Sequence, residues 1–335
     1  MHNPYGLGFG FYGGHPLDTT IRLVEESERA GMDSCWIAED YFYGGAFSTA
    51  AVCAANTSRI KIGIGVINPF TRHPLLSAME AASLDVISKG RILLGIGAGN
   101  KRWMEELVKI PYEKPIQATK EAALIVKELL RNRQIQFDGE VFHTGEVHLD
   151  ITPYRPDMPV VMGVKGPKAL YAAGQIADGV LLSTMTSIGY VRFAKEQIRK
   201  GAESVGRDPS EIKIAAYFPM HVDSDSHAAK EKCKDVVAQF IGIHGFHPIL
   251  FEAGYTEEFI APFREALLAG DTRRMIPQVS DEVVENLCIA GTPEECRRRL
   301  EDLNAAGVDM PVAFEIPSVP PMESLRLISQ AVLGE

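Results

Sequence analysis

The sequence predicts an α/β fold, a TIM (β/α)8 barrel, with insertions after the fourth and seventh strands. Short aliphatic runs alternate with helical patterns eight times in 335 residues. The runs are continuously apolar, as parallel strands covered by helices require. No linker interrupts the alternation, so we expect one domain over residues 1–335. An open, doubly wound sheet is the alternative that this alternation leaves open.

Each predicted strand is followed by a helix or by a longer insertion. The strands are expected at 6–12, 34–40, 60–67, 91–99, 159–164, 179–184, 212–222 and 310–317. Asp18 is placed to cap the first helix, and Thr292 with Glu295 forms a capping box at a later one. The helix after the third strand has Leu75, Met79, Ala82 and Val86 at helical spacing.

Charge and cysteine usage limit the partners and the compartment. The formal net charge is −10 without a basic block, which argues against nucleic acid or an anionic membrane as a partner. The five cysteines are scattered and form no C-x-x-C pair, so we expect reduced thiols in a cytoplasmic protein. Neither a signal peptide nor an apolar run of membrane-spanning length is visible.

Functional residues of a barrel lie at the carboxyl ends of its strands. That rule selects Glu39 and Asp40 after the second strand, where two acids could bind a polar group or form a solvated strand end. Glu252 follows the apolar run Ile249–Phe251 in the second insertion. We expect its carboxyl to be partly shielded, with a raised pKa suited to proton donation, although the spacing alone slightly favours an ordinary surface carboxylate.

Two glycine-rich segments lie at further strand ends. Residues 95–101, GIGAGNK, place Gly97, Ala98 and Gly99 in a turn where a flat ring could approach the backbone. The segment is not G-x-G-x-x-G, so it does not indicate a dinucleotide fingerprint.

The second segment, residues 163–170 or GVKGPKAL, begins a helix. Gly163, Gly166 and Lys165 would lie near the free amides of its first turn, which attract phosphate. Ser183 and Thr184, one strand later, could donate further hydrogen bonds. Ordinary helix initiation is the alternative interpretation.

Residues 63–74, GIGVINPFTRHP, combine a buried strand with turn-forming residues. Gly65, Val66 and Asn68 lie at its carboxyl end and are candidate cofactor contacts. His73 precedes Pro74 at a helix start, where a capping role is favoured over a ligand role. No histidine, cysteine and carboxylate spacing indicates a metal.

The order of these segments resembles one known family. GVINPFTRHP, LDVISKGRILLGIGAGNK, GPKALYAAGQIADGVLLS, IAAYFPMHVDSD, LFEAGY and IAGTPEE are similar to segments of methylene-tetrahydromethanopterin reductase. That enzyme belongs to the luciferase-like superfamily and uses the deazaflavin coenzyme F420. The resemblance implies a coenzyme ring beside Gly65 and Val66, whose peptide bond would be cis, near Gly97–Gly99. It also implies a phosphate near Gly163, Gly166, Ser183 and Thr184.

The sequence departs from that reductase at the residues placed near its pterin substrate. Gly10 and Asn100 stand where the reductase has acids, and Glu39-Asp40-Tyr41 replaces an Asp-His-Tyr triplet. Glu252 matches its third acid. The resemblance therefore implies a retained coenzyme site and an altered substrate site.

Three hypotheses follow from these observations. The leading one is an F420-dependent oxidoreductase that transfers a hydride between the deazaflavin and a small organic substrate, with a reductase-like pterin activity included. The second is an FMN-dependent monooxygenase of the same superfamily. The third is a barrel without chemistry that serves as a binding or assembly subunit. The resemblance also implies a homodimer or a larger homo-oligomer.

Overall fold

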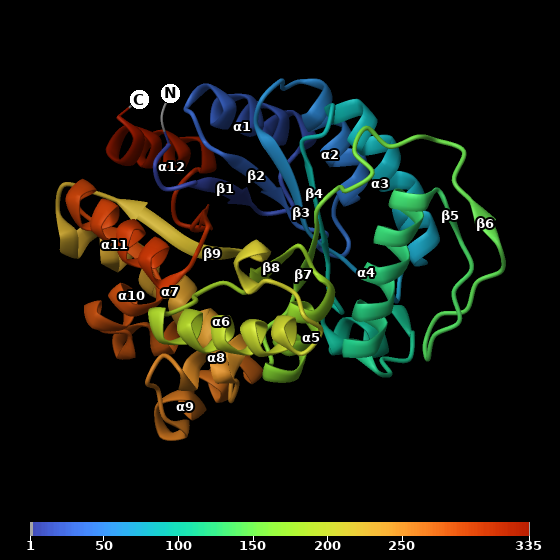
Figure 1. Cartoon of the computed structure of the whole chain (residues 1–335). Coiled ribbons are helices and arrows are strands. Elements are labelled where there is room, and N and C mark those ends of the chain that lie inside the picture. The colour runs from blue at the N-terminus through green and yellow to red at the C-terminus, as the bar shows by residue number, and fades with distance from the viewer. Residues whose placement is uncertain (1–2, 335) are drawn as a thin grey trace.

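The computed structural model describes residues 3–334; residues 1, 2 and 335 of the predicted domain lie outside that part. Parallel strands close into a barrel in the order β1-β2-β3-β4-β7-β8-β9-β11 (Figure 1). Closure depends on the pairings of β8 with β9 and of β11 with β1. These two pairings confirm the predicted TIM barrel and exclude the open sheet.

All eight predicted strand regions contain a barrel strand. The strands are β1 (Gly8–Phe11), β2 (Ser34–Ile37), β3 (Lys61–Ile67), β4 (Ile92–Ile96), β5 (Gln134–Ile135), β6 (Val147–His148), β7 (Val160–Gly163), β8 (Gly179–Leu182), β9 (Lys213–Val222), β10 (Ile289–Gly291) and β11 (Met310–Phe314). The helices are α1 (Leu17–Arg29), α2 (Ala46–Ala55), α3 (Pro74–Ser88), α4 (Pro115–Asn132), α5 (Pro167–Ile176), α6 (Ile188–Glu203), α7 (Ser226–His244), α8 (Pro248–Phe251), α9 (Glu257–Leu268), α10 (Asp281–Leu287), α11 (Pro293–Ala306) and α12 (Pro321–Ile328). Shorter helical turns are η1 (Trp103–Val108), η2 (Pro209–Glu211), η3 (Thr272–Gln278) and η4 (Ser329–Leu333).

The core has two layers, as the continuous apolar runs require. Inside the barrel, one cluster contains Trp36, Leu93, Val161, Leu181, Ala215 and Val312. A larger cluster fills the space between the strands and the surrounding helices. Because both faces of each strand are covered, alternation of polar and apolar residues is absent from the strands.

The two longest connections leave the barrel after β4 and after β9. The first contains η1, α4 and the antiparallel pair β5–β6, which extends along one side of the molecule (Figure 1). The second contains the five helices α7 to α11, the turn η3 and the strand β10, which pairs in parallel with β9. Both connections contribute helices to the pocket described below.

The predicted helix starts are mostly confirmed. Thr292 and Glu295 form the capping box, and the His73 side chain accepts a hydrogen bond from the Leu75 amide, at 3.3 Å. The prediction for Asp18 is wrong, because α1 begins two residues earlier than a cap at Asp18 requires, with Pro16 at the N-cap. Asp18 instead lies in the first turn, where its negative charge interacts favourably with the positive end of the helix dipole.

Helix α3 has small residues on the face that it turns towards the barrel. Its buried residues include Ala78, Ala81 and Ala82, whereas Leu76, Met79, Val86 and Ile87 are each between 43% and 53% exposed. Helical spacing was therefore a correct guide to the helix, but larger apolar residues such as Met79 lie on its outer face.

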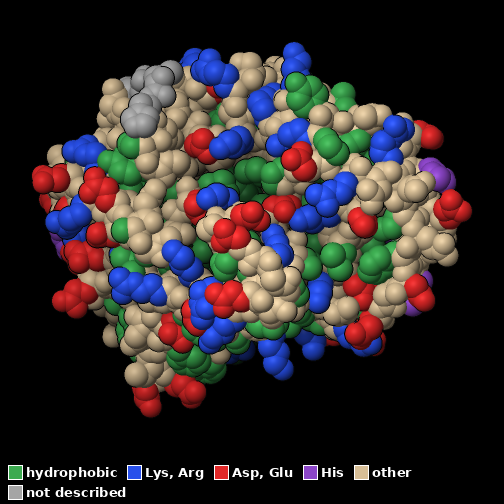
Figure 2. Space-filling model, in the orientation of Figure 1, with side chains coloured by type: hydrophobic (Ala, Val, Ile, Leu, Met, Phe, Trp, Pro, Cys, Tyr) green, Lys and Arg blue, Asp and Glu red, His purple; other side chains and the backbone are tan. Residues whose placement is uncertain are grey.

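Charged side chains of both signs are interspersed over the molecular face in Figure 2. Within residues 3–334, no helix combines the length and apolar character needed to cross a bilayer.

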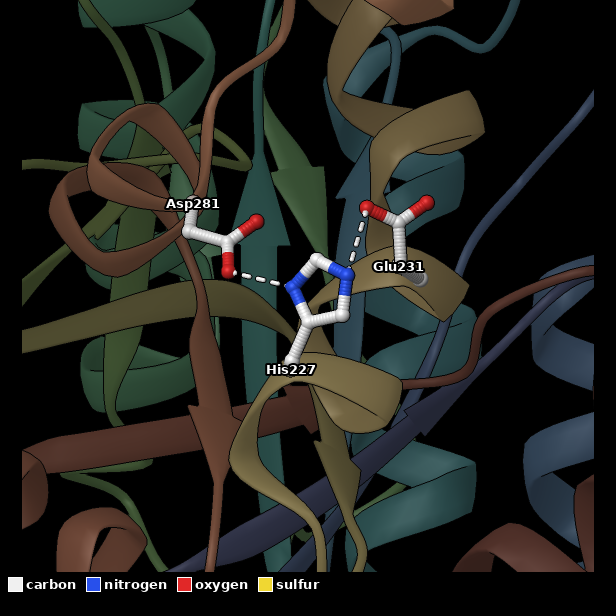
Figure 3. Close-up of side chains that lie close together, drawn as sticks. All are labelled: His227, Glu231 and Asp281. Atoms are coloured by element: carbon white, nitrogen blue, oxygen red, sulfur yellow. Dashed lines mark hydrogen bonds and ion pairs between the residues drawn. The ribbon is translucent and has the colours of Figure 1, made fainter.

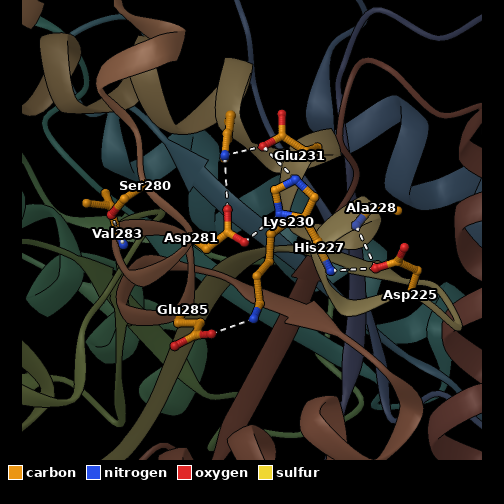
Figure 4. A network of polar contacts seen from close by, with 10 residues as sticks. Asp225, His227, Ala228, Lys230, Glu231, Ser280, Asp281, Val283 and Glu285 are labelled. Carbon is orange, nitrogen blue, oxygen red and sulfur yellow. Dashed lines mark hydrogen bonds and ion pairs between the residues drawn. The ribbon is translucent and has the colours of Figure 1, made fainter.

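An exposed cluster joins helix α7 to the start of α10. His227 lies between two carboxylates, with its Nδ1 2.7 Å from Asp281 and its Nε2 3.7 Å from Glu231 (Figure 3). Lys234 pairs with both carboxylates, and Lys230 pairs with Glu285 in the same network (Figure 4). Although the three side chains converge as metal ligands would, cations of the protein already compensate their charge. We interpret the cluster as an ion-pair network.

We expect the His227 pairing to stabilise the fold in mild acid. The Asp281 carboxylate raises the pKa of His227 above its ordinary value of 6.5. A group whose pKa is raised by folding contributes stability below its unfolded pKa and loses that contribution as pH rises through the folded pKa. His227→Gln should therefore lower the melting temperature more at pH 5.5 than at pH 8.5. Thermal unfolding of both proteins at both pH values checks this, and an equal difference would contradict it.

Candidate functional site

One pocket of about 540 Å³ opens at the carboxyl ends of the barrel strands. It lies where the barrel rule places an active site. Eight of the ten predicted cofactor contacts line it: Gly65, Val66, Ala98, Gly99, Gly163, Gly166, Ser183 and Thr184. The structure therefore brings together segments that are more than 100 residues apart in the sequence.

A bulge in β3 shapes the centre of the pocket. Ile64 pairs with Leu94 and Ile67 pairs with Ile96, so three residue steps of β3 face two of β4. The peptide bond between Gly65 and Val66 is cis, as the resemblance predicts. The additional residue directs the Val66 side chain towards β4 and β7.

The glycines opposite the bulge leave the space that Val66 occupies. A Cβ atom at Gly97 would lie 2.7 Å from Val66 Cγ2, and one at Gly163 would lie 2.6 Å from Val66 Cγ1. At Gly95 a Cβ would lie 2.9 Å from Val66 Cγ1 and 2.2 Å from the Ile64 carbonyl oxygen. Each distance is shorter than a normal carbon contact, so these glycines are needed for packing, and Gly97 itself does not line the pocket.

Asn68 supports the pocket from behind. Its side chain is buried and donates a hydrogen bond to the Ala98 carbonyl at 3.1 Å, while its Oδ1 accepts one from the Phe70 amide at 2.8 Å. A Cβ at Gly99, whose φ is +69°, would lie 2.5 Å from Asn68 Nδ2. Asn68 is not among the lining residues. The sequence predicted that Asn68 contacts the cofactor directly. In the structure it instead supports the glycine loop after β4.

The end of the pocket beside the start of α5 is suited to an anion. Gly166 is the N-cap of α5, and no side chain caps that helix, so amides of its first turn remain available to a ligand. Lys165 lines the pocket beside Gly166, Ser183 and Thr184. Burial lowers the pKa of Lys165. The phosphate location expected from the sequence therefore has both backbone amides and a cation.

Two histidines lie behind this end of the pocket. His244 is buried, and its Nε2–H donates to the Thr184 carbonyl at 2.8 Å. Burial, together with the positive charge of Lys165, lowers the pKa of His244 to about 3 and that of His247 to about 4. Both imidazoles are therefore neutral at pH 7, and they leave Lys165 as the cation that faces the pocket.

Asp40 is the carboxylate that lines the pocket. It follows β2, and its Oδ2 accepts a long hydrogen bond from the Gly13 amide, at 3.4 Å. Burial raises the pKa of Asp40. A carboxyl with a raised pKa can hold a proton closer to neutral pH, which suits an acid–base role.

The other two predicted acids are not among the lining residues. Glu39 forms an ion pair with Arg72, at 3.1 Å, and Arg72 also lies over the Phe47 ring. Glu252 lies just after the short helix α8 and is exposed. The expectation that Glu252 is shielded is wrong, because only Ile249 and Leu250 of the preceding apolar run are buried, whereas Phe251 and Glu252 are exposed.

Several lining residues were assigned no role from the sequence. Tyr217 and Phe314 come from β9 and β11, and strand-end position was a signal for Phe314 alone, because Tyr217 lies in the middle of β9. Tyr112, Ile116, Thr119 and Phe240 come from or beside helices α4 and α7. Nothing local in the sequence marks these helical residues, because their approach to the pocket depends on the path of the long connections.

Comparison with known proteins gives a consistent assignment. The family model described as luciferase-like monooxygenase matches residues 5–310. The 5,10-methylenetetrahydromethanopterin reductase of Methanolobus tindarius is 31% identical over 98% of this chain and 99% of its own. That of Archaeoglobus fulgidus is 32% identical over 95% of each chain.

A solved structure agrees with these relatives. The coenzyme F420-dependent tetrahydromethanopterin reductase from Methanopyrus kandleri superposes with a TM-score of 0.86, at 29% identity over 98% of each chain. The match extends through the barrel and through both long connections. The chain therefore belongs to the luciferase-like monooxygenase family.

Proposed function

We propose that the protein is a coenzyme F420-dependent oxidoreductase that transfers a hydride between the deazaflavin and a small organic substrate. The observation that carries this proposal is the single pocket in which the β3 bulge, the glycine loop after β4 and the start of α5 meet. Similarity over nearly the whole chain to the F420-dependent reductase from Methanopyrus kandleri supports the choice of coenzyme.

The lining residues fit a flat ring that carries a phosphate-bearing tail. Gly65 and Gly163 have no side chains, and Val66 is packed firmly enough against β4 and β7 to support one ring face. Lys165, the first amides of α5 and the hydroxyl of Ser183 offer donors to a phosphate.

The protein's own chemical contribution would come from Asp40 and from exclusion of water. When bound, the deazaflavin supplies the hydride at its own ring carbon. Asp40 can hold the proton that accompanies the hydride, because its pKa is raised by burial. Met162, Leu181 and Phe314 line the pocket with apolar surface, which keeps water from the reacting atoms.

An FMN-dependent monooxygenase is the second candidate. The name of the matching family model favours it. The substrate within the leading proposal includes methylenetetrahydromethanopterin, the substrate class named for the relatives from Methanolobus tindarius and Archaeoglobus fulgidus.

We also propose that the protein forms a homodimer through helix α3. Leu76, Met79, Val86 and Ile87 are exposed apolar side chains on this one helix. Such a contiguous apolar surface is typical of a protein interface. A second copy of the same helix would provide a matching apolar surface in a symmetric dimer.

We further propose a cytoplasmic location. All five cysteines are buried free thiols, which supports a reducing compartment. A cell-fractionation experiment with antibody detection would test this location.

Coenzyme binding distinguishes the two candidate functions. We expect titration with F420 to give saturable binding at micromolar concentration, because the pocket combines a ring slot with an anion-binding end. Reduced F420 should then be oxidised in the absence of oxygen when methylenetetrahydromethanopterin or another acceptor is added. Absorbance and fluorescence follow both steps. Tight FMN binding with oxygen uptake, and no F420 binding, would reverse the assignment.

We expect Gly97→Ala to damage the coenzyme site. The new methyl group would lie 2.7 Å from Val66 Cγ2 and 3.0 Å from the Gly163 carbonyl oxygen, so Val66 must move. Overpacking of this kind costs about 1–3 kcal/mol. The dissociation constant for F420 should rise by about tenfold, the change that about 1.4 kcal/mol produces.

Gly145→Ala is the matched control for that variant, because nothing lies within 4 Å of a Cβ at this position. It should bind F420 like the wild type. Chemical denaturation separates loss of fold from loss of the site. Unchanged F420 affinity in Gly97→Ala would mean that the Val66 packing does not shape the coenzyme site.

We expect the double substitution Met79→Lys and Val86→Lys to produce monomers. Two charges on the outer face of α3 would repel those of the second copy across a symmetric interface. Light scattering after size exclusion measures the mass. Leu268→Lys is the control, since Leu268 is also exposed and apolar but lies on α9. A wild-type protein that is monomeric would refute the proposed dimer.

A further inference from the structure

Two histidines of the second long connection border the end of the pocket beside α5. His244 is the last residue of α7 and His247 is the N-cap of α8, so two residues separate them. A Cβ atom at Gly166, the N-cap of α5, would lie 4.0 Å from His247 Nε2. The His244 Nε2 lies 2.8 Å from the carbonyl oxygen of Thr184, which lines the pocket. Both imidazoles therefore lie next to the position where we expect a phosphate.

Hydrogen bonding identifies His247 as a neutral imidazole. Its Nδ1 accepts a hydrogen bond from the Ile249 amide, at 3.3 Å. A ring nitrogen that accepts a hydrogen bond has a lone pair and carries no proton, so the single ring proton is on Nε2. This N–H is on the side of the ring that approaches Gly166. His247 therefore offers a ligand at the start of α5 a hydrogen-bond donor without a positive charge.

His244 is neutral for a second geometric reason. Its side chain is buried, and its Nε2–H donates to the Thr184 carbonyl. In the part of the chain that the structure describes, its buried Nδ1 has no hydrogen-bond partner. A proton on Nδ1 would create a buried charge with an unpartnered N–H, which is strongly unfavourable. The positive charge of Lys165, which acts on both histidines, opposes their protonation further.

Lys165 is therefore the single cationic side chain among the described residues that line the pocket. Lys168 lies in the first turn of α5 but is exposed and does not line the cavity. Arg264 of α9 lies over the exposed ring of Phe246 and is also absent from the lining. The remaining donors at this end are amides, a hydroxyl and an imidazole, which carry partial charges only.

We propose that this end of the pocket selects a phosphodiester over a phosphomonoester, and that the neutral side chain of His247 sets this choice. The inference rests on the proposed deazaflavin function. F420 carries its phosphate as a diester with one negative charge, whereas FMN carries a monoester with a charge of about −1.5 to −2 at pH 7. The second charge of a monoester would enter a partly buried site that has no second cation to pair with it, which costs free energy.

Substitutions at position 247 separate the effect of charge from the loss of the imidazole. His247→Lys places a second ammonium group beside Gly166. His247→Asn removes the ring but stays neutral, and asparagine is a favourable N-cap that can accept from the Ile249 amide in its place. Ala169→Lys adds a cation independently, because Ala169 lines the same end of the pocket from the first turn of α5. This variant decides the test if His247→Lys does not fold.

The test measures dissociation constants at pH 7.5 for three ligands that share one ring. They are the deazaflavin with its ribityl chain and no phosphate, the 5′-phosphate of that compound, and the methyl diester of that phosphate. Because the ring is constant, differences in affinity report on the anion end alone. Fluorescence titration gives each constant, and thermal unfolding verifies that each variant is folded. His148→Lys is the control for added charge, since His148 is exposed on β6 and does not line the pocket.

We expect the wild type to bind the methyl diester about tenfold more tightly than the 5′-phosphate, which corresponds to about 1.4 kcal/mol. In His247→Lys and in Ala169→Lys the ratio of these two dissociation constants should fall to about one, because a second cation then pairs with the second charge. His247→Asn and His148→Lys should keep the ratio of the wild type.

Three results would overturn the inference. They are a wild type that binds the 5′-phosphate as tightly as the methyl diester, a ratio that stays unchanged when either lysine is introduced beside Gly166, and a His247→Asn variant that loses the preference as fully as His247→Lys. The last would assign the selectivity to the imidazole itself. Failure of the wild type to bind F420 and all three ligands would instead contradict the proposed function, whereas F420 binding without a preference for the diester would contradict the inference alone.

Discussion

The candidate site depends on the packing of Val66 against three glycines. The bulge in β3 directs this one side chain at β4 and β7, and only glycine at positions 95, 97 and 163 leaves room for it. Protein interiors pack at the density of organic crystals, so a methyl group added at any of these positions would displace the Val66 side chain. Glycine at these three positions is therefore a packing requirement of the pocket.

The rest of the site is arranged around the Val66 side chain. Asn68 ties the end of β3 to the loop after β4 through the Ala98 carbonyl. The start of α5 and Lys165 provide a positive end at one side of the cavity, and Asp40 and Tyr217 add polar groups to the rest of its lining. A ligand with a flat ring and an anionic tail matches this distribution of shape and charge. The fold alone would not specify such a ligand, because many barrels share it.

Helices from the two long connections complete the pocket and limit access to it. Ile116 and Thr119 of α4 and Phe240 of α7 contribute walls that no barrel strand could supply. His244 of α7 links the same helix to the end of the pocket beside Lys165 through the Thr184 carbonyl. Variation in these connections can therefore change the substrate while the coenzyme site is kept, as is usual for barrel enzymes.

The sequence alone determined the barrel, the strand positions and the glycine segments, because continuous apolar runs and turn residues are local signals. It also predicted that Asp40 and the loop at Gly166 would lie at the pocket, since barrel sites lie at strand ends. Only the tertiary structure decided that Glu39 is engaged by Arg72, that Glu252 faces solvent and that Tyr217 reaches Gly65. These facts depend on side-chain directions and on contacts between distant segments, which no local pattern in a single sequence encodes.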